Sequence, residues 1–349
     1  MEKSNISSMH VGHKKRFKVH YAWIYVTERC NLHCEYCYFK HRQGREISLD
    51  AVRQLFLLFE RQETAPITLI LSGGEAFLAK ENLFKILKEA RRRLKRTSLH
   101  IQTNGLLIDP VSIEKLRDWG VSLEFGIDGA CEQTIRHRWG LKTVSFKRLT
   151  DNIKASLKAG ISCGCTMTVH PHEVQHMAEG LSFLQTLGLP RVDVTPAAFM
   201  PWTPEAIALF KKIYLQLARQ ADIRKLFYVR DDVEWIEPGV MDLSLHPPGY
   251  LLGGDPFLCL PENKRMEFSL WDTVNGVFKP EVLAYYQDAY ERMHEGSDKV
   301  LYREHVCHSF DLVNTMMGKQ YMNTRAINDI SRFLTRAHIA LGSRRRAAC

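Results

Sequence analysis

Three cysteines lie within one short stretch of the chain, TERCNLHCEYCYF. Their spacing is C-x3-C-x2-C, which places Cys30, Cys34 and Cys37 on a single loop. A structural zinc site uses four protein ligands, whereas three thiolates can hold a four-iron cluster and leave one iron without a protein ligand. An open coordination position is typical of a catalytic metal centre. Zinc stays open as an alternative, because His33 or His41 could supply a fourth ligand.

The chain has nine cysteines in 349 residues, and its first twenty residues lack the apolar core of a secretory signal. In a long chain of this kind, cysteines are expected as reduced thiols or metal ligands rather than as a disulfide framework. No run of about 18 apolar residues occurs, so no membrane span is predicted. We therefore expect a cytoplasmic protein without a membrane partner.

The formal net charge is +9, and part of the excess lies in two basic runs, RRRLKR at 91–96 and SRRR at 343–346. Such runs are compatible with a solvated helix face and a free tail, or with attraction to an acidic peptide or a nucleic acid. Neither run is interleaved with aromatic residues, and no RNA-binding signature occurs. A nucleic-acid partner is therefore not predicted.

Segments rich in β-forming residues alternate with amphipathic helical patterns. The predicted strands are 21–27, 67–72, 98–103, 121–127, 161–169 and 191–196. The predicted helices are 49–62, 80–96, 111–118, 145–159, 173–187 and 204–221. This alternation predicts an α/β fold with a parallel sheet, in the form of a partial TIM-type (βα)6 barrel.

The alternation ends near residue 222. The segment 234–256 is rich in Pro and Gly and is predicted as loops, and 257–272 is predicted as a two-stranded hairpin with a PEN turn. Helices are predicted near 280–294, 308–319 and 325–341. The predicted parts are a basic N-terminal arm, the barrel and a C-terminal α+β extension, at 1–18, 19–221 and 222–349.

Polar or glycine-rich motifs follow the predicted strands at their C-terminal ends, where parallel βα folds build their sites. These motifs are the cysteine loop, SGGE (72–75), TNG (103–105), GIDG (126–129) and TVHPH (168–172). Strand alternation places polar side chains such as His100 and Glu124 on the inner face, with Cys163 and Cys165 against the helices. Because buried polar groups need partners, we expect a wet, ligand-filled interior.

CNLHCEYC, together with SGGE and GIDG, resembles the radical S-adenosylmethionine (radical SAM) superfamily over roughly residues 21–200. The resemblance implies that the three cysteines bind one [4Fe–4S] cluster, whose open iron is chelated by SAM. It further implies that other residues contact SAM. These residues are Tyr36 near the adenine, Gly73, Gly74 and Glu75 at the ammonium group, and Asn104, Asp128 and Thr168 around the rest of the molecule.

The peptide-modifying branch of that superfamily often shows Ser-Ile-Asp-Gly followed by a His-Asp-x-x-Arg run. Here Gly126 replaces the serine and the His-Asp pair is missing. Arg138 matches the spacing of the motif's arginine, and the resemblance implies that it pairs with the methionine carboxylate of SAM. Arg136, two residues away, is the alternative.

The C-terminal extension resembles a SPASM or twitch extension that lacks the cysteines for auxiliary clusters. Beyond residue 222 only Cys259, Cys307 and Cys349 occur, without a CxxC pair, so no auxiliary cluster is predicted. If the reaction needs a thiol hydrogen donor, Cys259 and Cys307 are the candidates. Glu124 and His100 are candidate proton acceptors inside the barrel.

The resemblance implies reductive cleavage of SAM, followed by hydrogen abstraction from a peptide or protein, as in maturation of ribosomal peptides by epimerisation or cross-linking. An external electron donor such as flavodoxin or ferredoxin would supply the electron. Two alternatives stay open. The same chemistry could act on a nucleotide, sugar or amino acid, or the chain could be an iron–sulfur redox sensor.

Overall fold

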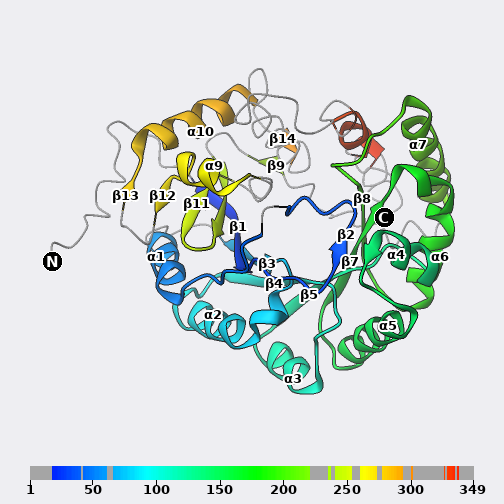
Figure 1. The fold of residues 1–349 in the computed structure, drawn as a ribbon, viewed down its shortest axis with the longest axis horizontal. Helices are drawn as coiled ribbons and strands as arrows, with labels where there is room; N and C mark the ends of the chain where they lie inside the picture. Colours follow the sequence, from blue (N-terminus) through cyan, green and yellow to red (C-terminus); the bar gives the residue numbers. More distant parts are fainter. Residues whose placement is uncertain are drawn as a thin grey trace, which may run out of the picture.

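A computed structural model describes residues 18–40, 42–60, 66–220, 235–236, 240–253, 260–272, 277–293, 300–301, 326, 328–334 and 336–337. One curved sheet forms the centre, and helices cover its outer face (Figure 1). The sheet order is β13-β12-β11-β10-β1-β3-β4-β5-β7-β8, and the described strands do not close into a barrel. The predicted α/β class and partial barrel are confirmed.

Seven neighbouring strands, from β10 to β8, run parallel, and three antiparallel strands extend the β10 edge. The parallel strands are β1 (Lys18–Thr27), β3 (Ile67–Gly73), β4 (Thr97–Thr103), β5 (Val121–Gly126), β7 (Cys163–Val169), β8 (Val192–Pro196) and β10 (Val240–His246). The antiparallel strands are β11 (Tyr250–Leu252), β12 (Trp271–Asp272) and β13 (Val277–Phe278). All six predicted strands are present.

The helices follow the predicted pattern. They are α1 (Leu49–Glu60), α2 (Lys80–Arg93), α3 (Pro110–Asp118), α4 (Cys131–His137), α5 (Thr143–Lys158), α6 (Met177–Thr186) and α7 (Pro204–Arg219), with the 3-10 turns η2 (Ala76–Ala79) and η3 (Pro171–His176). In α2 the buried residues Leu83, Ile86, Leu87 and Ala90 recur at helical spacing, so one apolar stripe packs on the sheet. The predicted pattern had no separate helix at α4.

The basic run that ends α2 bonds to neighbouring elements. Arg91 donates to the backbone oxygens of Thr97, Trp119 and Gly120, and Arg93 forms an ion pair with Glu60. These contacts connect the end of α2 to α1 and to the segments that begin β4 and β5, so Arg91 and Arg93 serve packing.

The two faces of the sheet differ as strand alternation predicted. Outward-facing residues such as Leu123 and Phe125 lie in the main apolar core, together with Cys163 and Cys165 at 2% and 0% exposure. The inner face of β1 is aromatic, and Tyr25 lies there in a smaller cluster. Inner positions on β4, β5, β7 and β8 are polar and partly exposed: Gln102, Glu124, Thr166, Thr168, Asp193 and Thr195.

The C-terminal part corrects two predictions. Residues 234–256, predicted as loops, contain β10, which pairs in parallel with β1 and lengthens the sheet. Its apolar side chains Leu243 and Leu245 are fully buried, and Pro247, Pro248 and Gly249 form the turn that follows this strand. The central sheet therefore crosses the predicted boundary at residue 221.

The predicted PEN hairpin is also wrong, because α9 (Glu262–Glu267) begins there. Pro261 precedes its first turn, and five of the six helical residues are good helix formers, so local propensity favours the helix. The predicted C-terminal helix at 280–294 is present as α10 (Pro280–Met293). The described residues between 326 and 337 are helical, and the predicted helix at 308–319 lies outside the described residues. Among the described residues, no helix is long and apolar enough to cross a bilayer.

Candidate functional site

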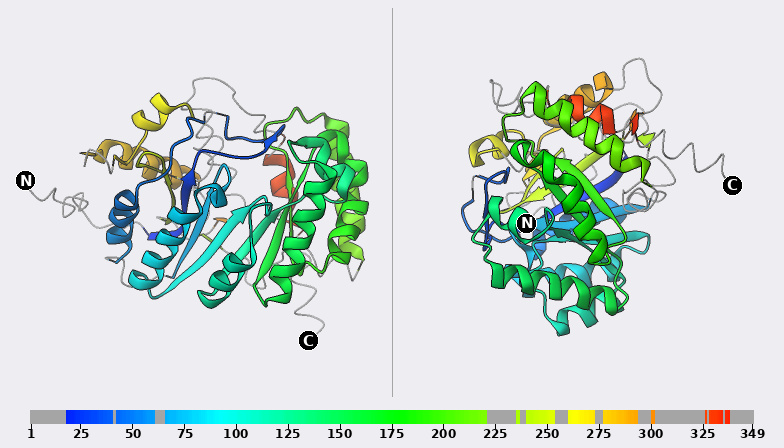
Figure 2. Two further views of the ribbon diagram at one scale, coloured as in Figure 1. Left: turned by 60° about the horizontal axis from the view of Figure 1, so that its bottom comes forward. Right: turned by 90° about the vertical axis from the view of Figure 1, so that its right-hand side faces the viewer.

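The cysteine loop leaves the C-terminal end of β1 and passes over one end of the sheet (Figure 2, left, dark blue). Part of it forms β2 (His33–Cys34), which pairs antiparallel with β6 (Arg138–Trp139). Cys34 lies opposite Arg138 in this two-stranded ribbon, and Glu35 N–H donates to the His137 carbonyl at 2.8 Å. Backbone pairing therefore fixes the second cysteine against the segment after α4.

All three thiols of the loop are partly buried and have polar neighbours. The Arg42 guanidinium donates to Cys37 Sγ at 3.0 Å, and Leu32 N–H donates to Cys30 Sγ at 3.4 Å. Burial raises the pKa of Cys34 to about 11, against the opposing charge of Arg138. Iron binding replaces the thiol proton, so a thiol set with donors to sulfur suits a thiolate-bound cluster.

The glycines of SGGE lie against the backbone of the cysteine loop. A Cβ at Gly73, where φ is +142°, would lie 2.4 Å from the Thr27 carbonyl oxygen. A Cβ at Gly74 would lie 2.3 Å from that of Arg29. Two hydrogen bonds join the segments: Gly74 N–H to Thr27 O at 2.9 Å, and Glu75 N–H to Arg29 O at 2.8 Å. Glycine is therefore required where the end of β3 supports the loop.

Glu75 is 1% exposed, and its carboxylate is held by neutral donors. It accepts from Phe77 N–H at 3.1 Å, Thr103 Oγ1 at 2.8 Å and Asn104 N–H at 2.7 Å. Burial raises its pKa, and none of the described Lys, Arg or His side chains contributes an opposing charge. A buried carboxylate that is bonded but not neutralised provides a site for an ammonium group. The Asn104 side chain reaches Asn31 of the cysteine loop at 2.8 Å.

Three of the predicted SAM-contact residues, Tyr36, Arg138 and Thr168, bond to a fourth, Asp128. Arg138 donates Nε and Nη2 to this carboxylate at 2.8 and 2.7 Å, and the Tyr36 hydroxyl donates to it at 2.5 Å. Thr168 N–H donates to the second oxygen at 3.0 Å. Arg138 is buried, whereas Arg136 is exposed and pairs with Glu173. Arg138 is therefore the arginine that points into the site, and its carboxylate partner in this structure is Asp128.

Sterics explain why residue 126 is a glycine. A Cβ at this position would lie 2.7 Å from Nη1 of Arg138. The glycine that replaces the serine of the related motif thus leaves room for a guanidinium that lies over β5. The Arg138 Cζ is also 5.5 Å from the centre of the Tyr36 ring, a cation–π distance.

The two predicted proton acceptors lie on the inner face of the sheet and bond to protein groups. Glu124 pairs with Arg191 at 2.7 Å and accepts from Thr166, and burial raises its pKa. The Nδ1 atom of His100 lies 2.5 Å from the Ser122 hydroxyl. Neither contacts the residues around Asp128 in the described structure. The other two predicted catalytic residues, Cys259 and Cys307, lie outside the described residues.

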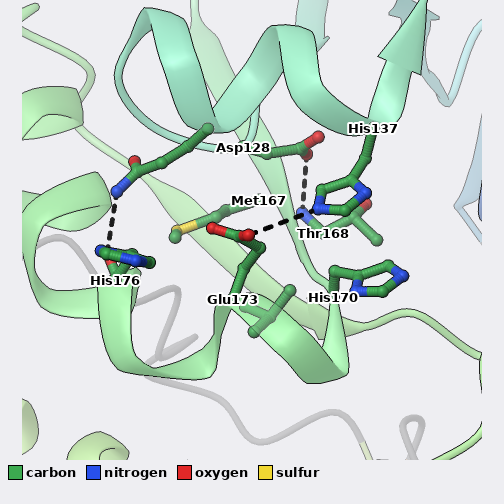
Figure 3. A pocket seen from close by; sticks show the side chains of 9 residues that line it. Asp128, His137, Met167, Thr168, His170, Glu173 and His176 are labelled. Carbon is green, nitrogen blue, oxygen red and sulfur yellow. Dashed lines mark hydrogen bonds and ion pairs between the residues drawn. The ribbon is translucent and has the colours of Figure 1, made fainter.

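Sequence reasoning missed a group formed by Glu35, His137 and His170 (Figure 3 shows the two imidazoles). His137 Nδ1 lies 2.7 Å from the Glu35 carboxylate, and Glu173 lies 3.7 Å from His137 Nε2. The two rings stack at 4.1 Å with 6° between their planes, so their in-plane lone pairs do not converge on one ion. The group therefore links the cysteine loop to the end of β7. His170, the first of the two histidines in TVHPH, was the signal for it.

A second missed group lies under the start of the loop. Glu28 is fully buried and pairs with Arg45 at 3.0 Å and with Arg265 of α9 at 3.1 Å. Burial raises the pKa of Glu28, but the Arg45 hydrogen bond and the Arg265 charge hold it below its ordinary value. No local pattern could reveal a pair whose members are 237 residues apart.

Comparison with known proteins shows which family and which relatives this chain is similar to. Residues 24–184 match the model of the radical SAM superfamily. A curated relative from Pyrococcus furiosus, the tungsten-containing aldehyde ferredoxin oxidoreductase cofactor-modifying protein, is 24% identical over 195 residues, 54% of this chain and 53% of that one. An S-adenosylmethionine-dependent nucleotide dehydratase from Fibrobacter sp. is 28% identical over 171 residues, 44% and 50% of the two chains. The chain thus spans about half the length of the curated relatives it matches.

Solved structures share the fold at low identity. The structure titled native anSMEcpe with bound AdoMet and Cp18Cys peptide has a TM-score of 0.67 and 14% identity, and the match covers 94% of this chain and 99% of that one. Streptococcus suis SuiB bound to precursor peptide SuiA has a TM-score of 0.55 and 14% identity, with 69% and 60% covered. The superfamily uses a [4Fe–4S] cluster and SAM, and the matched segment holds the cysteine loop, SGGE and GIDG. Residues 24–184 of this chain therefore form a radical SAM domain.

Proposed function

We propose that the chain is an enzyme that cleaves SAM reductively at a [4Fe–4S] cluster held by Cys30, Cys34 and Cys37, and that it abstracts a hydrogen atom from a peptide or protein. The observation that carries the SAM assignment is Glu75, a buried carboxylate beside the cysteine loop with no described cationic partner. The cluster, when bound, supplies the electron that cleaves SAM.

The side chains of the site hold and orient these groups. Glu75 would accept the ammonium of the SAM methionine moiety, while Gly73 and Gly74 keep the loop backbone close to it. Asp128, fixed by Arg138 and Thr168, holds the Tyr36 hydroxyl, so the aromatic ring has one orientation beside Cys34 and Cys37. Asn104 ties the end of β4 to the loop. Positioning of this kind is what a protein contributes when the cofactor carries the chemistry.

The polar residues on the inner face of the sheet are suited to binding a polar substrate. Gln102, Glu124, Thr166 and Asp193 lie on that face and are partly exposed. Two structural neighbours are titled as complexes with peptides, which supports a peptide or protein substrate for this chain as well. Maturation of a ribosomal peptide, by epimerisation or cross-linking, is the reaction type we propose. Cys259 and Cys307 stay candidate hydrogen donors for it, and a flavodoxin or ferredoxin is the proposed electron donor.

A small molecule is the second candidate substrate. The relative named as a nucleotide dehydratase supports it, because this chain matches half of that protein. A nucleotide, sugar or amino acid would need the same cluster and the same SAM contacts.

The deciding experiment follows deuterium. The reconstituted, reduced protein should form 5′-deoxyadenosine from SAM, and Cys34→Ala should form none. Deuterated candidate peptides and deuterated nucleotides, sugars and amino acids are then supplied in turn. Deuterium in 5′-deoxyadenosine from a peptide alone supports the proposal, and deuterium from a small molecule alone favours the second candidate. Cluster binding without SAM cleavage under any substrate would contradict both and favour a redox sensor.

A further inference from the structure

An exposed tryptophan lies on the outer side of the strand that pairs with the cysteine loop. Trp139 is 55% exposed, one of the few large apolar side chains that are open to solvent among the described residues. Its neighbour on β6, Arg138, is 8% exposed and points to Asp128. Since successive side chains of a strand point to opposite faces, the ribbon has an inner face and an outer face.

The opposite strand continues this division. Cys34 pairs with Arg138, and the exposed His33 pairs with Trp139. The outer face of the β2–β6 ribbon is thus His33 and Trp139, one residue away from a predicted iron ligand. Only the thickness of a two-stranded ribbon separates this surface from Cys34.

Basic side chains flank the same ribbon. Lys40 is exposed, and its ammonium bonds to the backbone oxygen of Glu35 at 2.9 Å, next to Cys34. Lys142 is exposed at the end of the turn that follows Trp139. That turn is close to the loop, because a Cβ at Gly140 would lie 3.4 Å from the Asn31 carbonyl oxygen. An aromatic centre with a basic rim suits an acidic protein partner.

We propose that this outer face, His33 and Trp139 with Lys40 and Lys142 flanking it, docks an acidic one-electron donor protein of the flavodoxin or ferredoxin type. The inference rests on the proposed function, which needs one electron at the cluster. In the transfer the donor loses one electron and the cluster gains it, with no bond made or broken. The net charge of +9 assists the approach of an acidic partner.

The test separates docking from chemistry. The full-length, cluster-reconstituted protein is mixed with reduced flavodoxin in a stopped-flow instrument, and cluster reduction is followed by the loss of its visible absorption. Trp139→Glu should lower the second-order rate constant by about tenfold or more, and Lys142→Glu by about threefold with a weaker salt dependence. Reduction by dithionite, which needs no docking surface, should stay within about twofold of wild type in both variants.

Matched controls lie on distant helices. Val111→Glu changes a residue of α3 that is 56% exposed, and Lys88→Glu reverses an exposed charge on α2. Both should reduce with flavodoxin as wild type does. Unchanged flavodoxin rates in Trp139→Glu would overturn the proposal, as would an equal loss with dithionite, since that result would show damage to the cluster loop. A wild type that takes up electrons but cleaves no SAM refutes the proposed function and leaves the docking result standing.

Discussion

Two buried carboxylates flank the cysteine loop, and their surroundings are opposite. Glu28 at the start of the loop is 0% exposed and lies between two guanidinium groups, Arg45 and Arg265. Glu75, from the next strand, is 1% exposed and meets three neutral donors. The pKa of Glu28 is held low and that of Glu75 is raised. Burial of a carboxylate therefore does not by itself indicate a ligand site. A buried carboxylate without a cationic partner among the described residues, such as Glu75, does.

The largest expected effect concerns the balanced carboxylate. Arg265→Met should lower the free energy of unfolding by about 3–5 kcal/mol, because it leaves part of a buried charge without its partner. Urea unfolding of the full chain measures the loss. Lys264→Met, which removes the neighbouring surface ion pair with Glu267, should cost less than about 1 kcal/mol. Equal losses in the two variants would contradict the structural role of Arg265.

The unbalanced carboxylate should matter for binding rather than folding. Glu75→Gln should weaken SAM binding by about 10–100-fold, because a neutral amide removes the charge that holds the ammonium group. Calorimetry with cluster-reconstituted protein measures the affinity, and Glu89→Gln on α2 is the control with unchanged affinity. A variant that binds SAM normally would remove the main support for the SAM assignment.

The same residue predicts a pH dependence. Because burial raises the folded-state pKa of Glu75, the folded chain binds this proton more tightly than the unfolded chain. The stability of wild type relative to Glu75→Gln is therefore greatest below the unfolded pKa of about 4.3 and falls as the pH rises through the raised value. Unfolding of both SAM-free proteins across this range tests it, and a stability difference that does not vary with pH would be inconsistent with a raised pKa.

The smallest expected effect concerns a third carboxylate, Asp128, which is balanced by Arg138. Gly126→Ala should cost about 1 kcal/mol, because the new Cβ displaces the guanidinium from its place over β5. Ser98→Ala, at an exposed position of the neighbouring strand β4, is the control and should leave the stability unchanged. No loss of stability in Gly126→Ala would show that Arg138 can bind Asp128 from another position.

The sequence predicted those strands and site residues that a short stretch of chain is enough to reveal. Alternating apolar and polar residues revealed the six core strands and both faces of the sheet, and the motifs at the strand ends located the loop and Glu75. Strand β10 was missed because prolines and glycines around a short apolar run are also typical of loops. The contact between Glu28 and Arg265 was missed because a distant pair leaves no periodic trace. Likewise, the bond from Arg138 to Asp128 depends on a ribbon that only the folded chain forms.

The position of β1 in the sheet has a consequence for the evolution and engineering of this protein. β1, which the cysteine loop directly follows, lies between β3 and the C-terminal strand β10. A truncated chain that ends at residue 221 would leave one side of β1 as an open edge, with unpaired backbone groups available for aggregation. The C-terminal part is therefore more than an interchangeable substrate module. A chimera with another extension must keep a strand equivalent to β10, and α9 with its arginine, to preserve the cysteine loop.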